Sequence, residues 1–180
     1  MTNKILTVIV PSYNVEQYLP ETIPSFLQKE VLEKIEVLIV NDGSKDGTAK
    51  IGKQFEEEYP NTVKLVNKEN GGHGSTINKG IELAQGNYIK VVDGDDWVDE
   101  KAFVKYINEL EKIDVDMVLT PFIRVNIDTK KKEKKAFDGI TENKIYDIED
   151  LLNRLKDTYQ MHSVTFNRNV LKNMRQIDEH

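Results

Sequence analysis

The sequence predicts an α/β fold with a mostly parallel central sheet. Four short apolar runs, each followed by a stretch with helical periodicity, are the first observation. This alternation is typical of βαβ units, whose strands run parallel to one another. The second observation is that the runs are nearly continuous in Val, Ile and Leu, which is typical of strands buried on both faces. A chain of 180 residues is long enough for one domain with a sizeable core.

Each strand and helix of the predicted sheet can be assigned in order. The expected strands are residues 5–10, 37–40, 63–66 and 88–92. The expected helices that follow them are residues 16–29, 48–59, 75–84 and 99–112. Pro20 and Pro24 interrupt the first helical pattern, so we expect this helix to start late or to kink.

The alternation of apolar strands and helical stretches weakens after residue 117. Residues 117–127, MVLTPFIRVNI, suggest a strand that continues past a proline. The lysine-rich residues 129–135 suggest the tip of a hairpin in solvent, with contact to an anionic lipid or polymer as the alternative. Helical patterns return at residues 148–156 and 169–174.

Composition excludes several classes of protein. The net charge of −6 argues against a general nucleic-acid binder. The chain has no cysteine, so it has neither a disulfide framework nor a zinc–thiolate site. No apolar run approaches the ~20 residues of a transmembrane helix. The N-terminal residues resemble a first strand more than a signal peptide, so the cytoplasm is the expected compartment.

Polar clusters follow all four predicted strands. They are residues 11–14 (PSYN), 41–47 (NDGSKDG), 70–74 (NGGHG) and 93–96 (DGDD). Right-handed crossovers bring the carboxyl ends of parallel strands to one edge of the sheet, where open α/β sheets bind ligands. We therefore expect the four clusters to form one site.

Two of these clusters partly match known ion and phosphate loops. Residues 42–47 follow a calcium loop at its first positions, but Lys53 stands where the loop needs glutamate. Residues 70–74 are rich in glycine but lack the Gly-Lys-Ser/Thr ending of a phosphate loop. His73 is open to three interpretations: a base, a ligand contact or a solvent-facing residue.

The acidic cluster has two explanations that apply to different residues. Asp99 and Glu100 suit the positive N-terminal end of the helix that follows. Asp93 directly ends a buried strand, and helix capping does not explain it. Asp93 and Asp95 are oxygen ligands at alternate positions, which suits Mg²⁺ or Mn²⁺ carrying a substrate diphosphate.

Taken together, these segments resemble the family 2 glycosyltransferases, whose domain has the GT-A fold. The matching pieces are VIVPSYN, VLIVNDGSKDGT, NGGHGSTINKGIELAQGNYI and VVDGDD, in that order. The resemblance implies a Rossmann-like three-layer sandwich over residues 1–180. Residues 1–112 would form its nucleotide-binding half, and residues 113–180 an acceptor-side part that is incomplete at the C-terminus.

The resemblance also implies roles for particular residues. Residues 11–14 (Pro11, Ser12, Tyr13 and Asn14) would line the nucleoside, with Tyr13 stacking near the base, and Asp42 would accept a hydrogen bond from uracil. Gly72 and His73 would pass close to the diphosphate or sugar, with Asn78 on the helix behind them. The segment Asp93–Gly94–Asp95 resembles the family's Asp-x-Asp motif. In it, Asp93 would contact ribose or a metal-bound water, and Asp95 would bind the metal.

The implied reaction is metal-assisted transfer of a sugar, with inversion, from a UDP-sugar to a glycan or lipid-linked acceptor. The full-length protein would act in the cytoplasm, with peripheral association at the inner face of the membrane. In the family, a late carboxylate acts as base. Asp178 and Glu179 are weak candidates for this base, and we expect the base itself to lie beyond residue 180. This chain should therefore bind the donor and the metal but transfer sugar poorly.

Other functions remain as alternatives. The first is an inactive nucleotide-sugar-binding module of the same fold. A nucleotidyltransferase would need basic residues in the loop after the first strand, and residues 11–18 have none. A glycoside hydrolase would need two carboxylates flanking a sugar, about 5–9 Å apart, rather than two residues apart in one loop.

Overall fold

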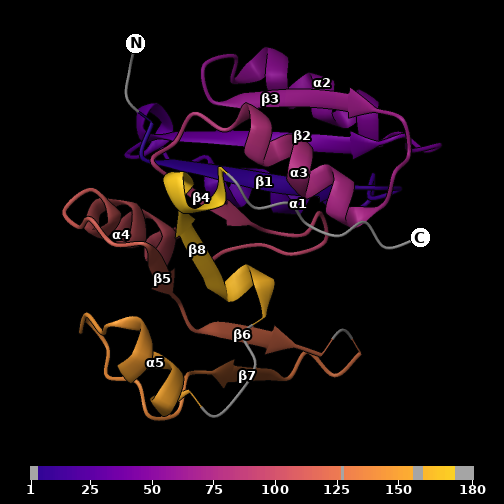
Figure 1. Ribbon diagram of the computed structural model, residues 1–180. Helices are drawn as coiled ribbons and strands as arrows, with labels where there is room; N and C mark the ends of the chain where they lie inside the picture. Colours follow the sequence, from indigo (N-terminus) through magenta and orange to yellow (C-terminus); the bar gives the residue numbers. More distant parts are fainter. Residues whose placement is uncertain (1–3, 127, 156–159, 173–180) are drawn as a thin grey trace.

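A six-stranded sheet forms the centre of the molecule. The computed structural model describes residues 4–126, 128–155 and 160–172, and the sheet order is β3-β2-β1-β4-β8-β5 (Figure 1). Its strands are β1 (Leu6–Ser12), β2 (Ile35–Asp42), β3 (Val63–Lys68), β4 (Tyr88–Val91), β5 (Met117–Leu119) and β8 (Val164–Asn167). Strands β1 to β4 pair in parallel, whereas β8 runs antiparallel to both β4 and β5. The predicted mostly parallel sheet is confirmed.

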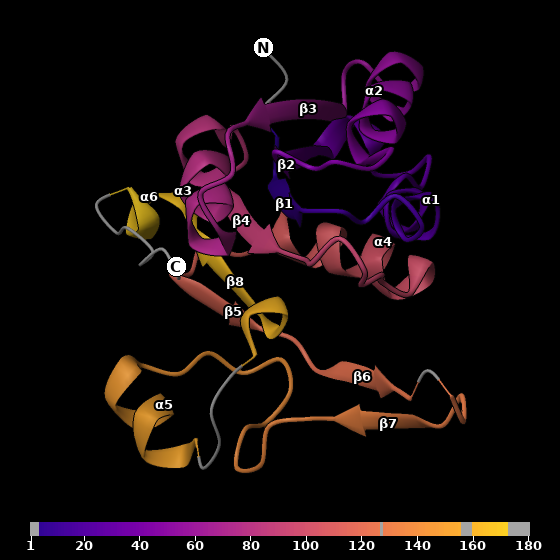
Figure 2. The same ribbon diagram turned by 90° about the vertical axis from the view of Figure 1, so that its right-hand side faces the viewer.

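Helices cover both faces of this sheet. They are α1 (Leu19–Thr22), α2 (Thr48–Glu58), α3 (His73–Leu83), α4 (Glu100–Leu110) and α6 (Arg168–Leu171). Helices α1, α2 and α4 lie on one face of the sheet, and α3 and α6 lie on the other (Figure 2). Side chains of the first group share one apolar cluster, and side chains of the second group share another. The fold is therefore the expected three-layer sandwich.

The central strands are buried throughout. Every residue of β1 and β2 is buried, which explains their continuous apolar sequence. Each fully buried aliphatic side chain contributes about 1.5–3 kcal/mol relative to exposure, so these strands dominate the core. Helix α3 approaches β1 closely because Gly80 has no side chain: a Cβ there would lie 2.5 Å from Ile9.

The first helix is broken, as expected from its prolines. Helix α1 is a single turn with Pro20 in its first turn, and a 3₁₀ turn, η1 (Pro24–Phe26), follows it. The second 3₁₀ turn, η2 (Leu32–Lys34), leads into β2. Leu19, Ile23 and Phe26 are fully buried, so the broken segment still contributes to the core.

Two expectations for the second half of the chain were wrong. Residues 117–125 form two strands in different sheets, β5 and β6 (Phe122–Val125), rather than one strand that continues past Pro121. Proline has no N–H for a strand ladder, which accounts for the break. The predicted hairpin exists, but Lys132–Lys135 form its second strand, β7, and do not belong to its tip.

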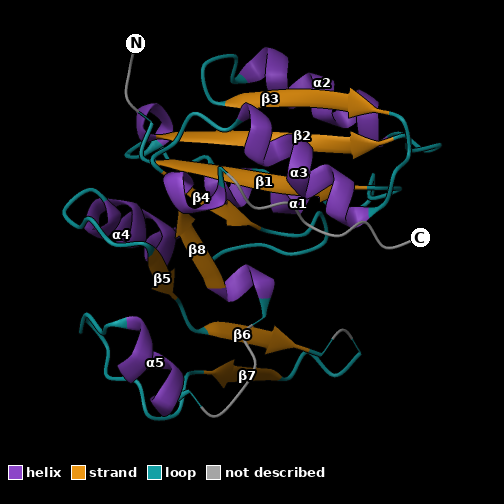
Figure 3. Cartoon of the chain, viewed as in Figure 1, coloured by secondary structure: helices purple, strands orange, loops and turns teal. Residues whose placement is uncertain are grey.

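A smaller lobe lies beside the sheet. It contains the β6–β7 hairpin and α5 (Ile148–Arg154), which starts at the predicted residue (Figure 3). Residues 156 and 173–174, where two predicted helices end, lie outside the described residues. Strand β8 and the 3₁₀ turn before it, η3 (Met161–Ser163), were not predicted. In the described part of the chain, no helix combines the length and the apolar character needed to cross a bilayer.

Candidate functional site

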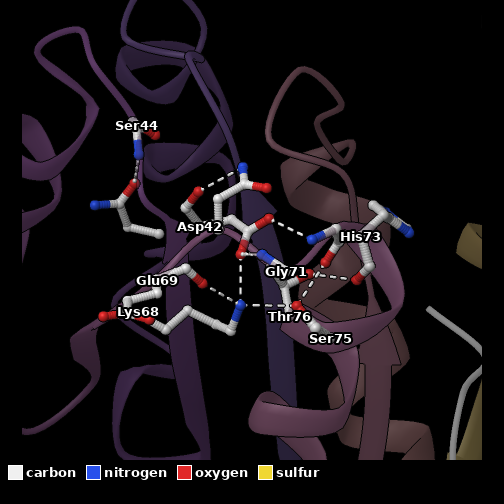
Figure 4. Close-up of polar contacts among 11 residues, drawn as sticks. Asp42, Ser44, Lys68, Glu69, Gly71, His73, Ser75 and Thr76 are labelled. Atoms are coloured by element: carbon white, nitrogen blue, oxygen red, sulfur yellow. Dashed lines mark hydrogen bonds and ion pairs between the residues drawn. The ribbon is translucent and has the colours of Figure 1, made fainter. Parts of the chain in front are cut away.

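Asp42, at the end of β2, organises the glycine-rich loop that follows β3. Its side chain is almost fully buried, and its Oδ1 accepts from Gly71 N at 3.0 Å while Oδ2 accepts from Gly72 N at 2.9 Å (Figure 4). The backbone oxygen of Asp42 also accepts from the Asn70 side chain at 3.0 Å. Gly72 has φ +84°, a conformation that glycine adopts without strain. The carboxylate therefore holds this loop against the end of the sheet.

Lys68 neutralises Asp42 and ties the same loop to α3. Its ammonium group lies 2.5 Å from Asp42 Oδ1, 2.6 Å from the Glu69 carbonyl oxygen and 2.7 Å from Ser75 Oγ (Figure 4). All three donors of the lysine are thus used. Both side chains of the pair are largely buried. Removing either one would therefore leave the charge of the other unpaired and with little access to water.

The loops after β1 and β2 are joined by hydrogen bonds. Asn14, with φ +54°, donates its N–H to Ser44 Oγ at 3.0 Å and accepts from Lys45 N at 2.9 Å. Val15 N donates to Thr48 Oγ1 at 2.9 Å. The first two predicted clusters are therefore one connected surface.

His73 joins the glycine-rich loop to the acidic loop. It is the first residue of α3 rather than a loop residue, and its Nε2 lies 2.9 Å from Asp93 Oδ1. A carboxylate only accepts hydrogen bonds, so the ring nitrogen is the donor. Both side chains are partly exposed, at 48% and 36%, which leaves the pair open to a ligand.

Gly94 packs the acidic loop against the loop after β1. A Cβ at this position would lie 3.0 Å from Val15 Cγ2 and 3.1 Å from the Pro11 carbonyl oxygen. Thr22 Oγ1 donates to the Gly94 carbonyl oxygen at 3.0 Å. A residue larger than glycine would push the two loops apart. All four predicted clusters therefore meet at one edge of the sheet, as expected.

Asp96 differs from its acidic neighbours in its surroundings. Burial raises the pKa of its carboxyl, the nearby His162 opposes this, and Asp93 and Asp95 add to the rise. His162 Nδ1 lies 3.8 Å from Asp96 Oδ2, and its ring packs edge-on against Phe122 at 4.7 Å between centroids. The small lobe thus reaches the acidic loop through η3.

The donor set of the acidic loop suits a metal that brings further ligands. Asp95 is exposed, and Asp93 is oriented by His73. Within the described ranges, no three His, Cys, Asp or Glu side chains gather in a way that could hold a metal ion. Two carboxylate oxygens plus phosphate oxygens match the preference of Mg²⁺ and Mn²⁺, so these residues fit a metal shared with a diphosphate.

The remaining predicted residues lie in varied surroundings. Ser12 is buried, and its hydroxyl donates to the Val10 carbonyl oxygen, whereas Tyr13 is 48% exposed at the site's rim. Asn78 lies partly buried on α3. Asp178 and Glu179 lie outside the described residues.

Sequence reasoning missed two residues of the site. Lys68 is the last residue of β3, and it pairs with Asp42, the last residue of β2, across the two parallel strands. The order of the strands in the sequence could have indicated this pairing. His162 is 66 residues away from Asp96 in sequence, and it lies in a 3₁₀ turn whose position no local pattern indicates.

Comparisons with known proteins identify the family and the fold of this chain. The family model described as "Glycosyl transferase family 2" matches residues 7–174. The minor teichoic acid biosynthesis protein GgaB of Bacillus subtilis is 34% identical over 150 residues, which are 82% of this chain and 16% of that protein. The chain therefore spans only a small part of that relative.

Solved structures share the fold at lower identity. TarS residues 1–349 of S. aureus, solved in complex with UDP, superpose with a TM-score of 0.67 at 22% identity, over 93% of this chain and 48% of that one. The mannosyltransferase PcManGT of Pyrobaculum calidifontis, solved with GDP-Man and Mn²⁺, has a TM-score of 0.64 at 21% identity, with 45% of its chain covered. With its sheet order, its four converging loops and a family match over nearly its whole length, the chain belongs to glycosyltransferase family 2 and has the GT-A fold.

Proposed function

We propose that this chain binds a nucleoside diphosphate sugar at the carboxyl edge of its sheet. The reaction that it supports is metal-assisted transfer of the sugar, with inversion of configuration at the anomeric carbon. The observation that carries the proposal is the contact of His73 with Asp93, together with the bonds from Asp42 to Gly71 and Gly72. These contacts place the glycine-rich loop, the start of α3 and the acidic loop around one edge. Backbone N–H groups at a helix start suit phosphate oxygens, and carboxylates suit the accompanying metal.

In this proposal Asp93 and Asp95 hold Mg²⁺ or Mn²⁺ that enters with the donor. When bound, the metal stabilises negative charge on the departing diphosphate. His73 fixes the orientation of Asp93, and the exposed Asp95 supplies the second carboxylate. The Mn²⁺ in the structure of PcManGT, which shares the fold, supports the proposal of a divalent metal here.

We propose UDP as the nucleotide. A carboxylate has about four acceptor positions, and Lys68, Gly71 and Gly72 use three of those on Asp42. One position remains to accept from the ring N–H of uracil, and Tyr13, which is half exposed, is available to stack on the base. Complexes of TarS with UDP and UDP-GlcNAc support this choice.

We propose a glycan, polysaccharide or lipid-linked molecule as the acceptor, used at the cytoplasmic face of the membrane. The role of GgaB in teichoic acid biosynthesis supports a cell-envelope polymer. The base that deprotonates the acceptor hydroxyl is a carboxylate outside the described residues, either Asp178, Glu179 or a residue beyond 180. A base beyond residue 180 predicts that the chain by itself transfers sugar slowly or not at all, whereas Asp178 or Glu179 as the base predicts transfer by the chain itself.

The test is calorimetric titration of UDP and GDP in the presence of Mn²⁺ and again with EDTA. We expect UDP to bind with the metal, and Asp95→Asn to weaken binding roughly 10–100-fold through loss of a charged ligand. Asp99→Asn is the matched control, because Asp99 only caps α4 by accepting from Ala102 N at 2.9 Å.

Three outcomes separate the alternatives. Binding of GDP in place of UDP would keep the reaction class and change the donor. UDP binding that survives both EDTA and Asp95→Asn would favour a metal-independent nucleotide-binding module. Absence of binding to either nucleotide would contradict the proposed donor site.

A further inference from the structure

One face of the β6–β7 hairpin combines the exposed Ile123 and the half-buried Val125 with exposed lysines. Phe122 packs against His162, so the hairpin face that carries Phe122 is turned toward the rest of the protein at this residue, although Arg124 on the same face is exposed. Side chains alternate along a strand, and the register of the hairpin therefore places the opposite set together. That set, on the outward face, is Ile123, Val125, Lys132 and Lys134.

The charge of this hairpin is opposite to that of the whole chain. Residues 122–135 contain six Lys and Arg against two Asp and Glu, which is a net charge of +4. The whole chain has 25 basic and 31 acidic side chains, so the rest carries 19 against 29, a net charge of −10. A negatively charged surface would attract the hairpin and repel the remainder, which fixes the orientation of the protein.

The aliphatic component separates a bilayer from a soluble polyanion as the partner. Ile123 is 54% exposed and pairs directly with Lys134 across the two strands. A lysine beside an apolar residue can lay its stem along a lipid surface and keep its ammonium group among the head groups. A polyanion in water would gain nothing from Ile123, whereas the interface of a bilayer buries it.

We propose that the outer hairpin face, made of Ile123, Val125, Lys132 and Lys134, binds the surface of a bilayer rich in anionic lipid, together with the exposed Lys130 and Lys131 of the adjoining turn. Binding of the hairpin to a bilayer does not depend on the proposed function, but its consequence for sugar transfer rests on that function. Phe122 contacts His162, and His162 lies 3.8 Å from Asp96, so a docked hairpin would hold the acidic loop close to the membrane. A lipid-linked acceptor would then meet the donor at that surface.

The experiment is sedimentation of the protein with vesicles. Vesicles of phosphatidylglycerol and phosphatidylcholine in equal parts should bind the protein, and vesicles of phosphatidylcholine alone should not. Each lysine near an anionic surface contributes about a fivefold gain in affinity, so changing Lys131, Lys132 and Lys134 together to Gln should weaken binding on the order of a hundredfold. The matched control changes Lys50, Lys101 and Lys105 to Gln, which are exposed lysines of α2 and α4.

The aliphatic contribution is tested with single variants. Ile123→Ser should weaken vesicle binding roughly tenfold through lost apolar burial, and it should leave binding to inorganic polyphosphate unchanged. The matched control is Ile148→Ser on α5, a residue 65% exposed, which should bind vesicles as the unchanged protein does. Circular dichroism and UDP titration of every variant show whether the fold and the donor site are intact.

Several results would overturn the proposal. Equal losses in the two lysine triples would mean that only net charge matters. Loss with Ile148→Ser but not with Ile123→Ser would move the surface to α5. Binding to polyphosphate with no response of vesicle binding to Ile123→Ser would assign the lysines to a soluble polyanion. Vesicle binding through the hairpin by a protein that binds no nucleotide would keep this inference and contradict the proposed donor site.

Discussion

The two sheets of this protein differ sharply in how much their own residues bury. Every residue of β1 and β2 is buried between two helical layers, whereas β6 and β7 have no buried residue. The central sheet has six strands, and the hairpin sheet has two. A two-stranded sheet by itself has marginal stability in water. The large sheet therefore supplies most of the stability of the fold. The stability of the small lobe depends on its contacts with the large sheet.

Both regions contribute to the candidate site, but in different ways. The central sheet sets the positions of its loops directly, because each loop begins where a strand of that sheet ends. In the described part of the chain, the contacts of Phe122 with His162 and of His162 with Asp96 connect the small lobe to the site. We therefore expect changes in the core to alter global stability and changes in the lobe to remain local.

The largest expected effect is a core truncation in the central sheet. Ile39→Ala in β2 removes a fully buried side chain, and it should lower the free energy of unfolding by about 2–5 kcal/mol. Ile123→Ala in β6 is the matched control, since its side chain is 54% exposed, and its effect should stay within about 0.5 kcal/mol. Denaturation in urea measures both. Similar losses in the two variants would contradict the contrast between the sheets.

The second prediction concerns Lys90, which lies on β4 where the central sheet turns toward the small lobe. The side chain is buried, its Nζ donates to Thr120 Oγ1 at 3.2 Å, and it lies 5.7 Å from the centroid of the Tyr106 ring. Burial lowers the pKa of Lys90 from 10.5 to about 7. Lys90→Met should therefore stabilise the fold at pH 7, by up to roughly 4 kcal/mol.

The pH dependence of this gain has a definite sign. Between pH 7 and 10.5 the unfolded chain binds the lysine proton and the folded chain does not, so the original protein gains stability as pH rises. The advantage of Lys90→Met should thus shrink toward zero near pH 10.5. Urea denaturation of both proteins at pH 7 and pH 10 measures it. An advantage that stays constant with pH, or Lys101→Met giving the same gain from an exposed site, would contradict the explanation.

The smallest expected effect compares two helix caps of the same chemistry. Asp99 caps α4 by accepting from Ala102 N at 2.9 Å, and Asp147 caps α5 by accepting from Asp150 N at 2.8 Å. Changing either residue to Ala should cost about 1 kcal/mol of helix stability. For α4, which packs on the core, we expect the loss in the global free energy of unfolding.

For α5, the loss should appear only as faster amide exchange of residues 148–154, because the helix belongs to the small lobe. Hydrogen exchange together with urea denaturation measures both kinds of loss. A global loss from Asp147→Ala, equal to that from Asp99→Ala, would show that the two regions unfold as one unit.

Much of the fold could be predicted because its signals are local. Continuous apolar runs and helical periodicity identified β1 to β4, α2, α3 and α4, and proline positions explained the broken first helix. The prediction failed at Pro121, where one apparent strand is divided between two sheets. Strand β8 was missed because it enters the sheet antiparallel between β4 and β5, far from both in sequence. Pairing of distant strands leaves little trace in a local pattern.

The site shows the same division between local and distant information. The four polar clusters were found from sequence because each follows a strand, and parallel strands bring their ends together. Their bonding partners were not found: Lys68 against Asp42, and His162 against Asp96, depend on side chains of different segments. The functional roles of the clusters remain proposals for the titrations described above.

By itself, the sequence determined the α/β class, the sheet edge that carries the polar loops and the family to which the chain belongs, because repeated short patterns encode strands, helices and turns. Only the tertiary structure decided that Asp42 is neutralised by Lys68, that His73 orients Asp93, and that Ile123, Lys132 and Lys134 share one face of the hairpin. These features arise from packing between segments far apart in the chain. Burial and contact between such segments depend on the whole fold, and no single stretch of sequence specifies them.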